Sequence, residues 1–317
     1  MALKGKYAHA NTLIKILQWL GCMFLFSIIA GGCMFIFPQP FSLTSLKWIQ
    51  LFQAAAMFLL PPLCMAYLWS TKPLEWLQLS TPTTKDFDSA EKSLSPQGKL
   101  GGKLIILAIG IMLVALPAIN MLSYLNQQMV LPAFLEPLEA WMKAKEESAT
   151  QLTEAFMAAH NLGGLIINLL LLAVLPAISE ELTFRAVLQK LFTPQRNIAS
   201  AQHIAIWCSA ILFSAIHMQF YGFIPRMLMG ALFGYALVWT GSLWIPIIMH
   251  LTNNAMAVLL YFTATRAGWD KAILDTIGTN DTLWLGIASL FITIGGIYAL
   301  RRSTTISRAS SRISNGN

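Results

Sequence analysis

Residues 165–185 read LIINLLLLAVLPAISEELTFR, and this stretch decides the fold. Its first part holds a single polar residue, Asn168, and extends back to residue 161 as a segment of membrane-spanning composition. About 17–25 such residues cross a bilayer as a helix. Three charged residues, Glu180, Glu181 and Arg185, then follow directly at the predicted lipid boundary. Charge at such a place is costly, so it indicates function.

The composition of the whole chain agrees with a membrane location. Of 317 residues, 56% are apolar and only 11% are charged, and the mean hydropathy is +0.62. A soluble domain carries about 25% charged residues. The sequence therefore predicts an all-α, multi-pass transmembrane helical bundle. The net charge of +7 comes from residues at the two ends and in one loop. We assign this charge to the bilayer surface and exclude nucleic acid as a partner.

Eight apolar stretches are candidate membrane spans, which gives a bundle of about eight spans. The spans divide the chain into N-terminal helices (1–160), a chemically distinct core (161–265) and a last helix with a basic, disordered tail (266–317). Both termini are basic, so we expect both in the cytoplasm of a protein in the cell membrane. The eight stretches are approximately 14–37, 51–70, 103–124, 161–178, 203–218, 223–240, 243–263 and 282–300.

Two loops carry opposite charge. The loop near 71–102 has four lysines, which places it inside, and the loop near 125–160 has five glutamates, which places it outside. We expect the acidic loop to form a short amphipathic helix at the surface. Arg226 begins a predicted span, and we expect its side chain to extend to the interface.

The acidic pair has one obvious partner. Glu181 and Arg185 are four residues apart and share one helix face, where they can form an ion pair. Glu180 points about 100° away. This pairing leaves Glu180 as the carboxylate that is available as a base. A solvated charge cluster at a helix end remains the alternative.

Two histidines favour the functional interpretation. His217 ends the apolar stretch 204–216, and His250 lies in an apolar run with Asn254 four residues later on the same face. A polar group without a partner costs several kcal/mol in hydrocarbon. We therefore predict that Glu180, His217, His250 and Asn254 meet in one polar cavity between helices.

Such a cavity suggests hydrolysis. Glu180 would take a proton from water with help from His217, while His250 and Asn254 would stabilise an oxyanion. Alternatively, Glu180, His217 and His250 would hold a zinc ion. The spacing does not choose between zinc and no cofactor, although the absence of HExxH excludes the helical zincin arrangement.

These motifs resemble those of the CPBP family, the CAAX-processing and bacteriocin-processing membrane proteases. The resemblance rests on Glu180-Glu181-x-x-x-Arg185, Phe213-x-x-x-His217 and His250-x-x-x-Asn254, in order, over about a third of the chain. It implies an intramembrane endopeptidase of the glutamate type or the metallo type, acting on a membrane-associated protein or peptide. Glu180 and His217 would activate water, His250 and Asn254 would stabilise the oxyanion, and Glu181 and Arg185 would support the site.

Two other functions remain open. A proton-coupled transporter also places Glu and His inside a membrane, but the chain shows no repeated half. A catalytically silent immunity or scaffold protein could keep the same fold. The presence of every motif residue favours the protease.

Overall fold

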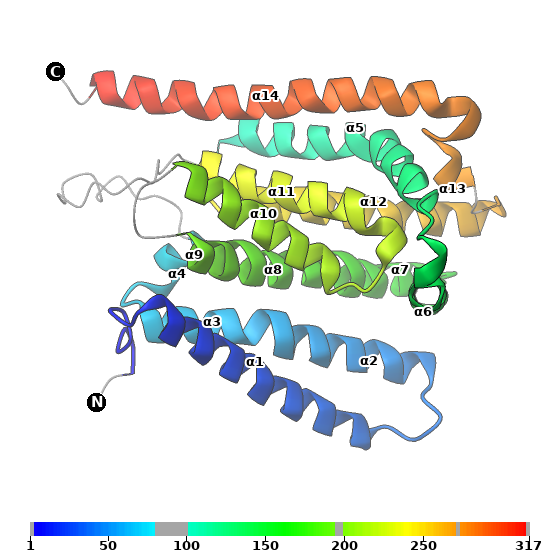
Figure 1. The fold of residues 1–317 in the computed structure, drawn as a ribbon, viewed down its shortest axis with the longest axis horizontal. Helices are drawn as coiled ribbons and strands as arrows, with labels where there is room; N and C mark the ends of the chain where they lie inside the picture. The colour runs from blue at the N-terminus through cyan, green and yellow to red at the C-terminus, as the bar shows by residue number, and fades with distance from the viewer. Residues whose placement is uncertain (1–2, 80–100, 194–198, 271–272, 315–317) are drawn as a thin grey trace.

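The computed structural model describes residues 3–79, 101–193, 199–270 and 273–314 as an assembly of helices (Figure 1). The expected all-α membrane bundle is confirmed. The α-helices are α1 (Thr12–Cys33), α2 (Leu43–Ala54), α3 (Leu60–Trp69), α4 (Pro73–Trp76), α5 (Gly102–Gln127), α6 (Glu136–Met157), α7 (Leu162–Asn168), α8 (Leu175–Glu181), α9 (Gln189–Phe192), α10 (Ala199–Ala215), α11 (Phe223–Thr240), α12 (Trp244–Ala267), α13 (Ile273–Thr276) and α14 (Leu283–Ser314).

Shorter helical segments join several of these. Three are π-helical, with one extra residue per turn: Ala55–Leu59, Leu169–Val174 and Leu182–Leu188. They connect neighbouring α-helices into longer rods, α2 with α3 and α7 with α8 and α9. Four are 3₁₀ turns: Met34–Ile36, Ala133–Leu135, Phe220–Gly222 and Asn280–Thr282.

Within the described residues, seven helices are long and apolar enough to cross a membrane, and Ser200–Ala215 is a shorter apolar helix. Together they account for the eight predicted stretches. Helix α1 begins and helix α14 ends at the same end of the bundle, where the two chain termini also lie (Figure 1). The predicted lysine-rich loop falls mostly in residues 80–100, outside the described residues.

Two of the predicted spans are longer than the sequence suggested. The second begins at Leu43, and the fourth continues from Leu162 to Phe192. Glu180 and Glu181 therefore lie in the interior of a continuous rod and not at its end. The prediction stopped at residue 178 because charge normally ends a span, whereas here neighbouring helices supply partners for it.

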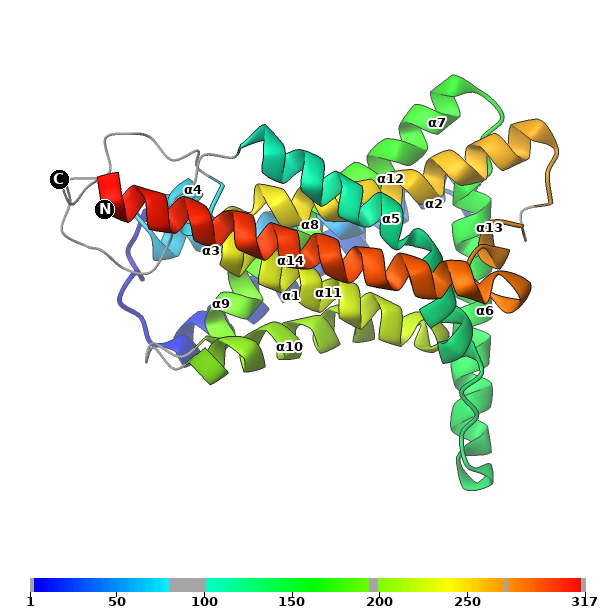
Figure 2. The ribbon, with the colours of Figure 1, turned by 90° about the horizontal axis from the view of Figure 1, so that it is seen from above.

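The acidic loop forms helix α6, as expected. Figure 2 shows α6 running across the direction of the long helices at the end of the bundle opposite the termini. Leu138 and Trp141 are exposed on it, beside charged residues such as Glu139 and Lys143. An amphipathic helix with this orientation is typical of a membrane interface.

The structure differs from the prediction of a disordered tail after residue 302. α14 continues as helix to Ser314, well beyond the apolar part of the chain. Extending an existing helix needs no new nucleation, and residues 303–314 contain neither proline nor glycine. The polar composition suggested disorder, but it does not stop a helix that the membrane segment has already started.

Proline residues inside spans leave backbone carbonyls without a helical donor, and neighbouring helices replace that donor. Pro62 cannot donate to the Phe58 carbonyl, which accepts a hydrogen bond of 2.9 Å from the Thr183 hydroxyl. Next to Pro117 in α5, the Ser289 hydroxyl bridges the helix ladder, because it accepts from the Ala118 N–H at 3.1 Å and donates to the Val114 carbonyl at 2.5 Å. These contacts fix α3 and α14 against their neighbours.

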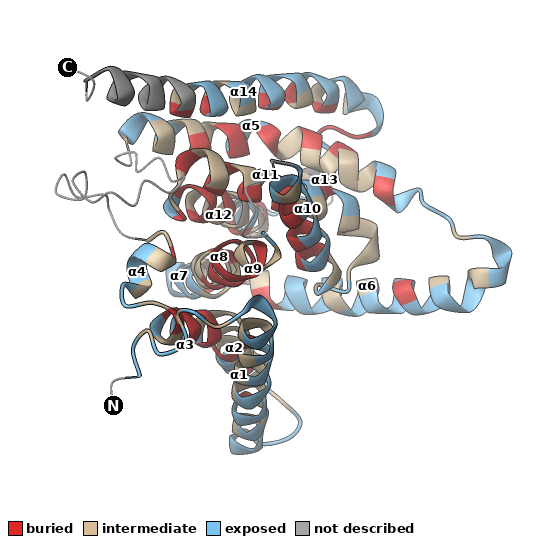
Figure 3. Cartoon of the chain, turned by 60° about the vertical axis from the view of Figure 1, so that its left-hand side comes forward, coloured by how far each residue is buried: buried red, intermediate tan, exposed pale blue. Residues whose placement is uncertain are grey.

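The buried residues gather in the middle of the bundle and leave α1 mostly exposed (Figure 3). One core cluster joins α5, α11, α12 and α14 around Phe233 and Met249. Another joins α1, α3, α10 and the segment 182–188 around Phe184 and Phe213. This second cluster and Phe233 surround the predicted site.

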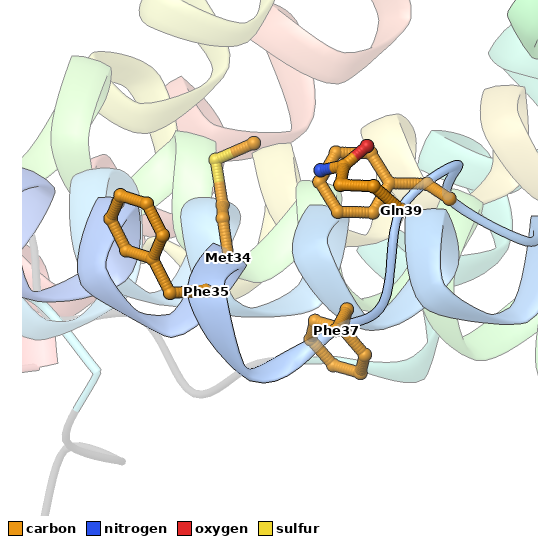
Figure 4. Close-up of a pocket in the computed structure, with 6 residues that line it drawn as sticks. Met34, Phe35, Phe37 and Gln39 are labelled. Carbon is orange, nitrogen blue, oxygen red and sulfur yellow. The ribbon is translucent and has the colours of Figure 1, made fainter.

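An apolar cavity of about 370 Å³ lies at the turn between α1 and α2. Met34, Phe35 and Phe37 line it beside the side chain of Gln39 (Figure 4). None of the predicted site residues lines this cavity, so it has no part in the chemistry below.

Candidate active site

The two glutamates lie between π-helical segments. α8 carries them, with Leu169–Val174 before it and Leu182–Leu188 directly after it. Such segments are rare and often occur at functional sites. Each adds a residue to a turn and so changes the direction of the side chains that follow. Here they set the directions of both carboxylates relative to the rest of the rod.

Glu181 is the centre of a buried polar network. Its Oε1 accepts hydrogen bonds from Arg185 Nη1 at 2.8 Å and from His250 Nδ1 at 2.9 Å. The side chains of Glu181 and Arg185 are 0% and 1% exposed. The predicted ion pair is therefore present in the structure, and it also holds His250 on the neighbouring helix α12.

Arg185 is enclosed on its other sides. Its Nη2 donates to the Gly230 carbonyl at 3.2 Å, and its guanidinium lies 4.3 Å from the centre of the Phe213 ring. A Cβ atom at Gly230 would come within 3.2 Å of Arg185 Nη2 and 3.1 Å of the Phe213 ring. The absence of a side chain at Gly230 therefore allows α11 to approach the guanidinium closely.

His250 is held by its ring as well as by Nδ1. The ring stacks on Phe233, with centroids 5.4 Å apart, and meets the edge of Phe213 at 5.9 Å. Because the Glu181 carboxylate accepts from Nδ1, the other nitrogen, Nε2, faces away from the network. It lies 3.9 Å from Glu180 Oε2.

His217 reaches the same oxygen from another helix. Its Nδ1 lies 2.8 Å from the Phe213 carbonyl, which can only accept, so Nδ1 carries the proton. Nε2 of the neutral ring is then an acceptor, and it lies 4.0 Å from Glu180 Oε2. Met218 follows with a φ of 53°, in the left-handed region that ends helix α10.

Glu180 Oε2 is buried and has no hydrogen-bond partner within the described part of the chain. Separations of 3.9 and 4.0 Å are too long for a direct hydrogen bond to either histidine. They suit one bridging water at about 2.8 Å from both atoms. The Glu180 and His217 side chains are 15% and 27% exposed, although Glu180 Oε2 itself is buried.

The comparisons with known proteins cover this same region. Residues 162–256 match a family model described as type II CAAX prenyl endopeptidase Rce1-like. We call residues 162–256, which are similar to this family, the Rce1-like segment. This confirms the family suggested by the three motifs, and all six predicted site residues fall inside the matched range.

The Rce1-like segment also has a relative among curated proteins. An uncharacterized protein YpbD of Bacillus subtilis (strain 168) is 30% identical over 93 residues, which are 28% of this chain. The chain spans 43% of the length of that relative. No solved structure matches the chain.

The Rce1-like segment brings Glu180, His217 and His250 together, but Asn254 has other partners. Asn254 Nδ2 donates to the Leu172 carbonyl at 3.1 Å, and Asn254 Oδ1 accepts from Asn253. Pro176 cannot donate to that carbonyl, so the amide replaces the missing helical donor. One N–H of Asn254 Nδ2 is left over, and its predicted role at the oxyanion stays a prediction.

The spacing of the three groups does not suit tetrahedral zinc. Two ligands about 2.0–2.1 Å from zinc stand roughly 3.3 Å apart, whereas the Nε2 atoms lie 3.9 and 4.0 Å from Glu180 Oε2. Within the described residues, no group of three or more His, Cys, Asp or Glu side chains could hold a metal ion. We therefore derive no step through a metal.

Sequence reasoning missed the aromatic walls and the backbone acceptors of the Rce1-like segment. Phe233 and Gly230 contact His250 and Arg185, yet neither is polar and neither follows a motif spacing. Leu172 could have been found, since a proline four residues later frees its carbonyl. Arg226 was interpreted as an interfacial residue, and the structure instead directs it toward the loop after His217.

Proposed function

We propose that this protein is an intramembrane endopeptidase that hydrolyses a peptide bond of a membrane-associated protein or peptide. The observation that carries the proposal is the buried Glu180 Oε2, which has no hydrogen-bond partner among the described residues and lies within 4.0 Å of Nε2 of His217, just after α10, and of His250 on α12. Glu180 Oε2 and His217 Nε2 would accept hydrogen bonds from one water, orient it and take its proton. The Rce1-like match supports the same class of reaction.

The reaction assigns a role to each group. Glu180 takes a proton from the water while His217 Nε2 accepts a hydrogen bond from it, and the water oxygen attacks the scissile carbonyl carbon. The proton on Glu180 then passes to the leaving amine as the carbon–nitrogen bond breaks. This leaves a carboxylic acid and an amine, and Glu180 returns to its starting state.

The oxyanion that forms on the scissile carbonyl needs hydrogen-bond donors of its own. The remaining N–H of Asn254 is one. His250 Nε2 is the other when both of its ring nitrogens carry protons, because Nδ1 already donates to Glu181. Glu181 then balances the imidazolium charge, and Arg185 holds Glu181 in position.

The test uses the full chain in liposomes with a membrane-tethered peptide that carries a fluorophore and a quencher. The peptide is supplied with and without a prenyl group, because the family description names prenyl endopeptidases. We expect Glu180→Gln and His217→Ala each to lower the cleavage rate by about 10²–10⁴-fold. His203→Ala is the matched control, since His203 lies on the same helix and bonds Tyr235 at 2.7 Å.

Unchanged cleavage in either site variant would refute the mechanism. Cleavage that depends on stoichiometric zinc and stops with a chelator would refute the metal-free version. Solute-dependent proton flux in the same liposomes, lost in both variants and accompanied by no peptide cleavage, would instead identify a transporter. A cellular phenotype that both variants retain would identify a silent scaffold.

A further inference from the structure

Arg226 lies beside the site without belonging to the network around Glu181. It occupies the first turn of α11, and its Nη2 and Nη1 donate to Gln219 Oε1 at 2.9 Å and to the Gln219 carbonyl at 3.4 Å. Gln219 is two residues after His217. The guanidinium is therefore held against the loop that presents a residue of the proposed active site.

The charge of Arg226 is not neutralised by an ion pair. In the part of the chain that the structure describes, no carboxylate oxygen lies within 4.0 Å of its nitrogens. Its charge acts on both Glu180 and His217 across longer distances. Glu146 also acts on it, but the Glu146 carboxylate accepts from the Tyr221 N–H at 3.1 Å.

Several donors of Arg226 stay available. A guanidinium has five N–H donors in a planar fork, and the two bonds to Gln219 use two of them. The side chain is half-buried, and a half-buried cation whose only bonded partners are neutral keeps a strong preference for an anion. The fork fits a carboxylate through two parallel hydrogen bonds.

We propose that Arg226 binds a carboxylate of the substrate and thereby selects peptides that carry one close to the scissile bond. This inference rests on the proposed function, since it gives the substrate class of the same site. The carboxylate has two possible sources, the carboxyl terminus of the peptide or an Asp or Glu side chain. Both offer the same chemistry, so the experiment separates them.

The experiment measures binding first, in the full-length Glu180→Gln protein in liposomes, where hydrolysis is blocked. Three membrane-tethered fluorescent peptides are compared: one ends in a free carboxylate, one in an amide, and one in an amide with a Glu in place of a Gln near the end. Each is titrated against protein with Arg226, with Arg226→Gln and with Arg226→Lys. Thermal melting of each variant reports folding.

We expect a peptide with a carboxylate to bind about 10- to 100-fold more tightly than the all-amide peptide, because bonds to charged groups are the strong ones. The free-terminus and Glu peptides show which carboxylate is used. The ratio should fall to about one with Arg226→Gln and to an intermediate value with Arg226→Lys, which keeps the charge but not the fork.

Equal binding of all three peptides with Arg226 present would overturn the inference, and this result does not depend on whether any variant folds. An unchanged ratio in Arg226→Gln would also overturn it. A uniform loss of affinity for all three peptides would show that Arg226 only positions the loop after His217.

A second run with Glu180 restored separates this inference from the proposed function. Discrimination in binding without cleavage of any peptide would refute the proposed function and leave the carboxylate site standing. Cleavage of all three peptides at equal rates would support the endopeptidase and refute the carboxylate site.

Discussion

Glu180 and Glu181 are adjacent residues of the same type, and replacing each with Gln should have opposite consequences. Glu181 is fully buried and its Oε1 accepts from Arg185 and His250. Glu180 Oε2 has no hydrogen-bond partner in the part of the chain that the structure describes. The structure therefore predicts that Glu181→Gln mainly destabilises the protein, whereas Glu180→Gln mainly removes activity.

The magnitude follows from the environment of Arg185. In Glu181→Gln its guanidinium, 1% exposed, loses the one carboxylate that lies within 4.0 Å of it among the described residues and becomes a buried charge without an ion-pair partner. Breaking a buried ion pair from one side costs about 3–5 kcal/mol. Glu180→Gln breaks no hydrogen bond at Oε2, so we expect the free energy of unfolding to change by less than about 1 kcal/mol.

The assay is equilibrium unfolding of the purified protein in mixed micelles, followed by tryptophan fluorescence. Glu181→Met combined with Arg185→Met is the matched control, because removing both charges should restore much of the stability that Glu181→Gln alone loses. If Glu181→Gln has the same free energy of unfolding as the wild type, or if Glu180→Gln is the less stable of the two variants, the assignment of structural and chemical roles is wrong.

Three further perturbations test other features. Thr183→Val leaves the Phe58 carbonyl buried without its donor and should cost about 1–3 kcal/mol in the same unfolding assay. Met218→Gly relieves a left-handed backbone and should stabilise by about 1 kcal/mol. The hydrogen bond from Lys143 holds the pKa of Glu139 below its usual range, so this contact is intact at neutral pH. It should be lost as the pH falls through that lowered pKa, with faster amide exchange at the start of α6.

Each of these three predictions would be contradicted by a different result. Unchanged stability in Thr183→Val would mean that another donor reaches the Phe58 carbonyl. A loss of stability in Met218→Gly would mean that the methionine side chain contributes more than its backbone costs. Amide exchange at the start of α6 could stay constant with pH after correction for intrinsic rates, or could change equally in Lys143→Gln. Either result would show that the stability of that turn does not depend on the ionisation of Glu139.

The helices and the meeting of three site residues follow from the intolerance of lipid for unpaired polar groups. That argument needs only sequence, and the structure places Nε2 of His217 and of His250 within 4.0 Å of Glu180 Oε2, whereas Asn254 bonds other groups. The argument also paired Glu181 with Arg185 from their spacing alone. It could not find the second partner of Glu181, His250, because nothing in the spacing shows which ring nitrogen faces which carboxylate.

Other features had no signal in the sequence. A π-helical segment differs from an α-helix by one residue in a turn, and an apolar run such as 169–174 has no polar periodicity in which that residue could be noticed. The bond of Asn254 to the Leu172 carbonyl depends on how two helices pack. The tail from 303 was predicted to be disordered from composition, which ignores the helix that precedes it.

The π-helical segments on both sides of α8 make the catalytic geometry unusually sensitive to chain length. An α-helix turns by about 100° per residue. Deleting a single residue between Leu182 and Leu188 would let the rod return to regular winding there, which would change the directions of the side chains within that segment, Arg185 among them. Arg185 would then lose its alignment with Glu181 even though no residue of the site had been replaced. Homologous chains that differ here by one residue in length should therefore differ in chemistry while keeping the same bundle.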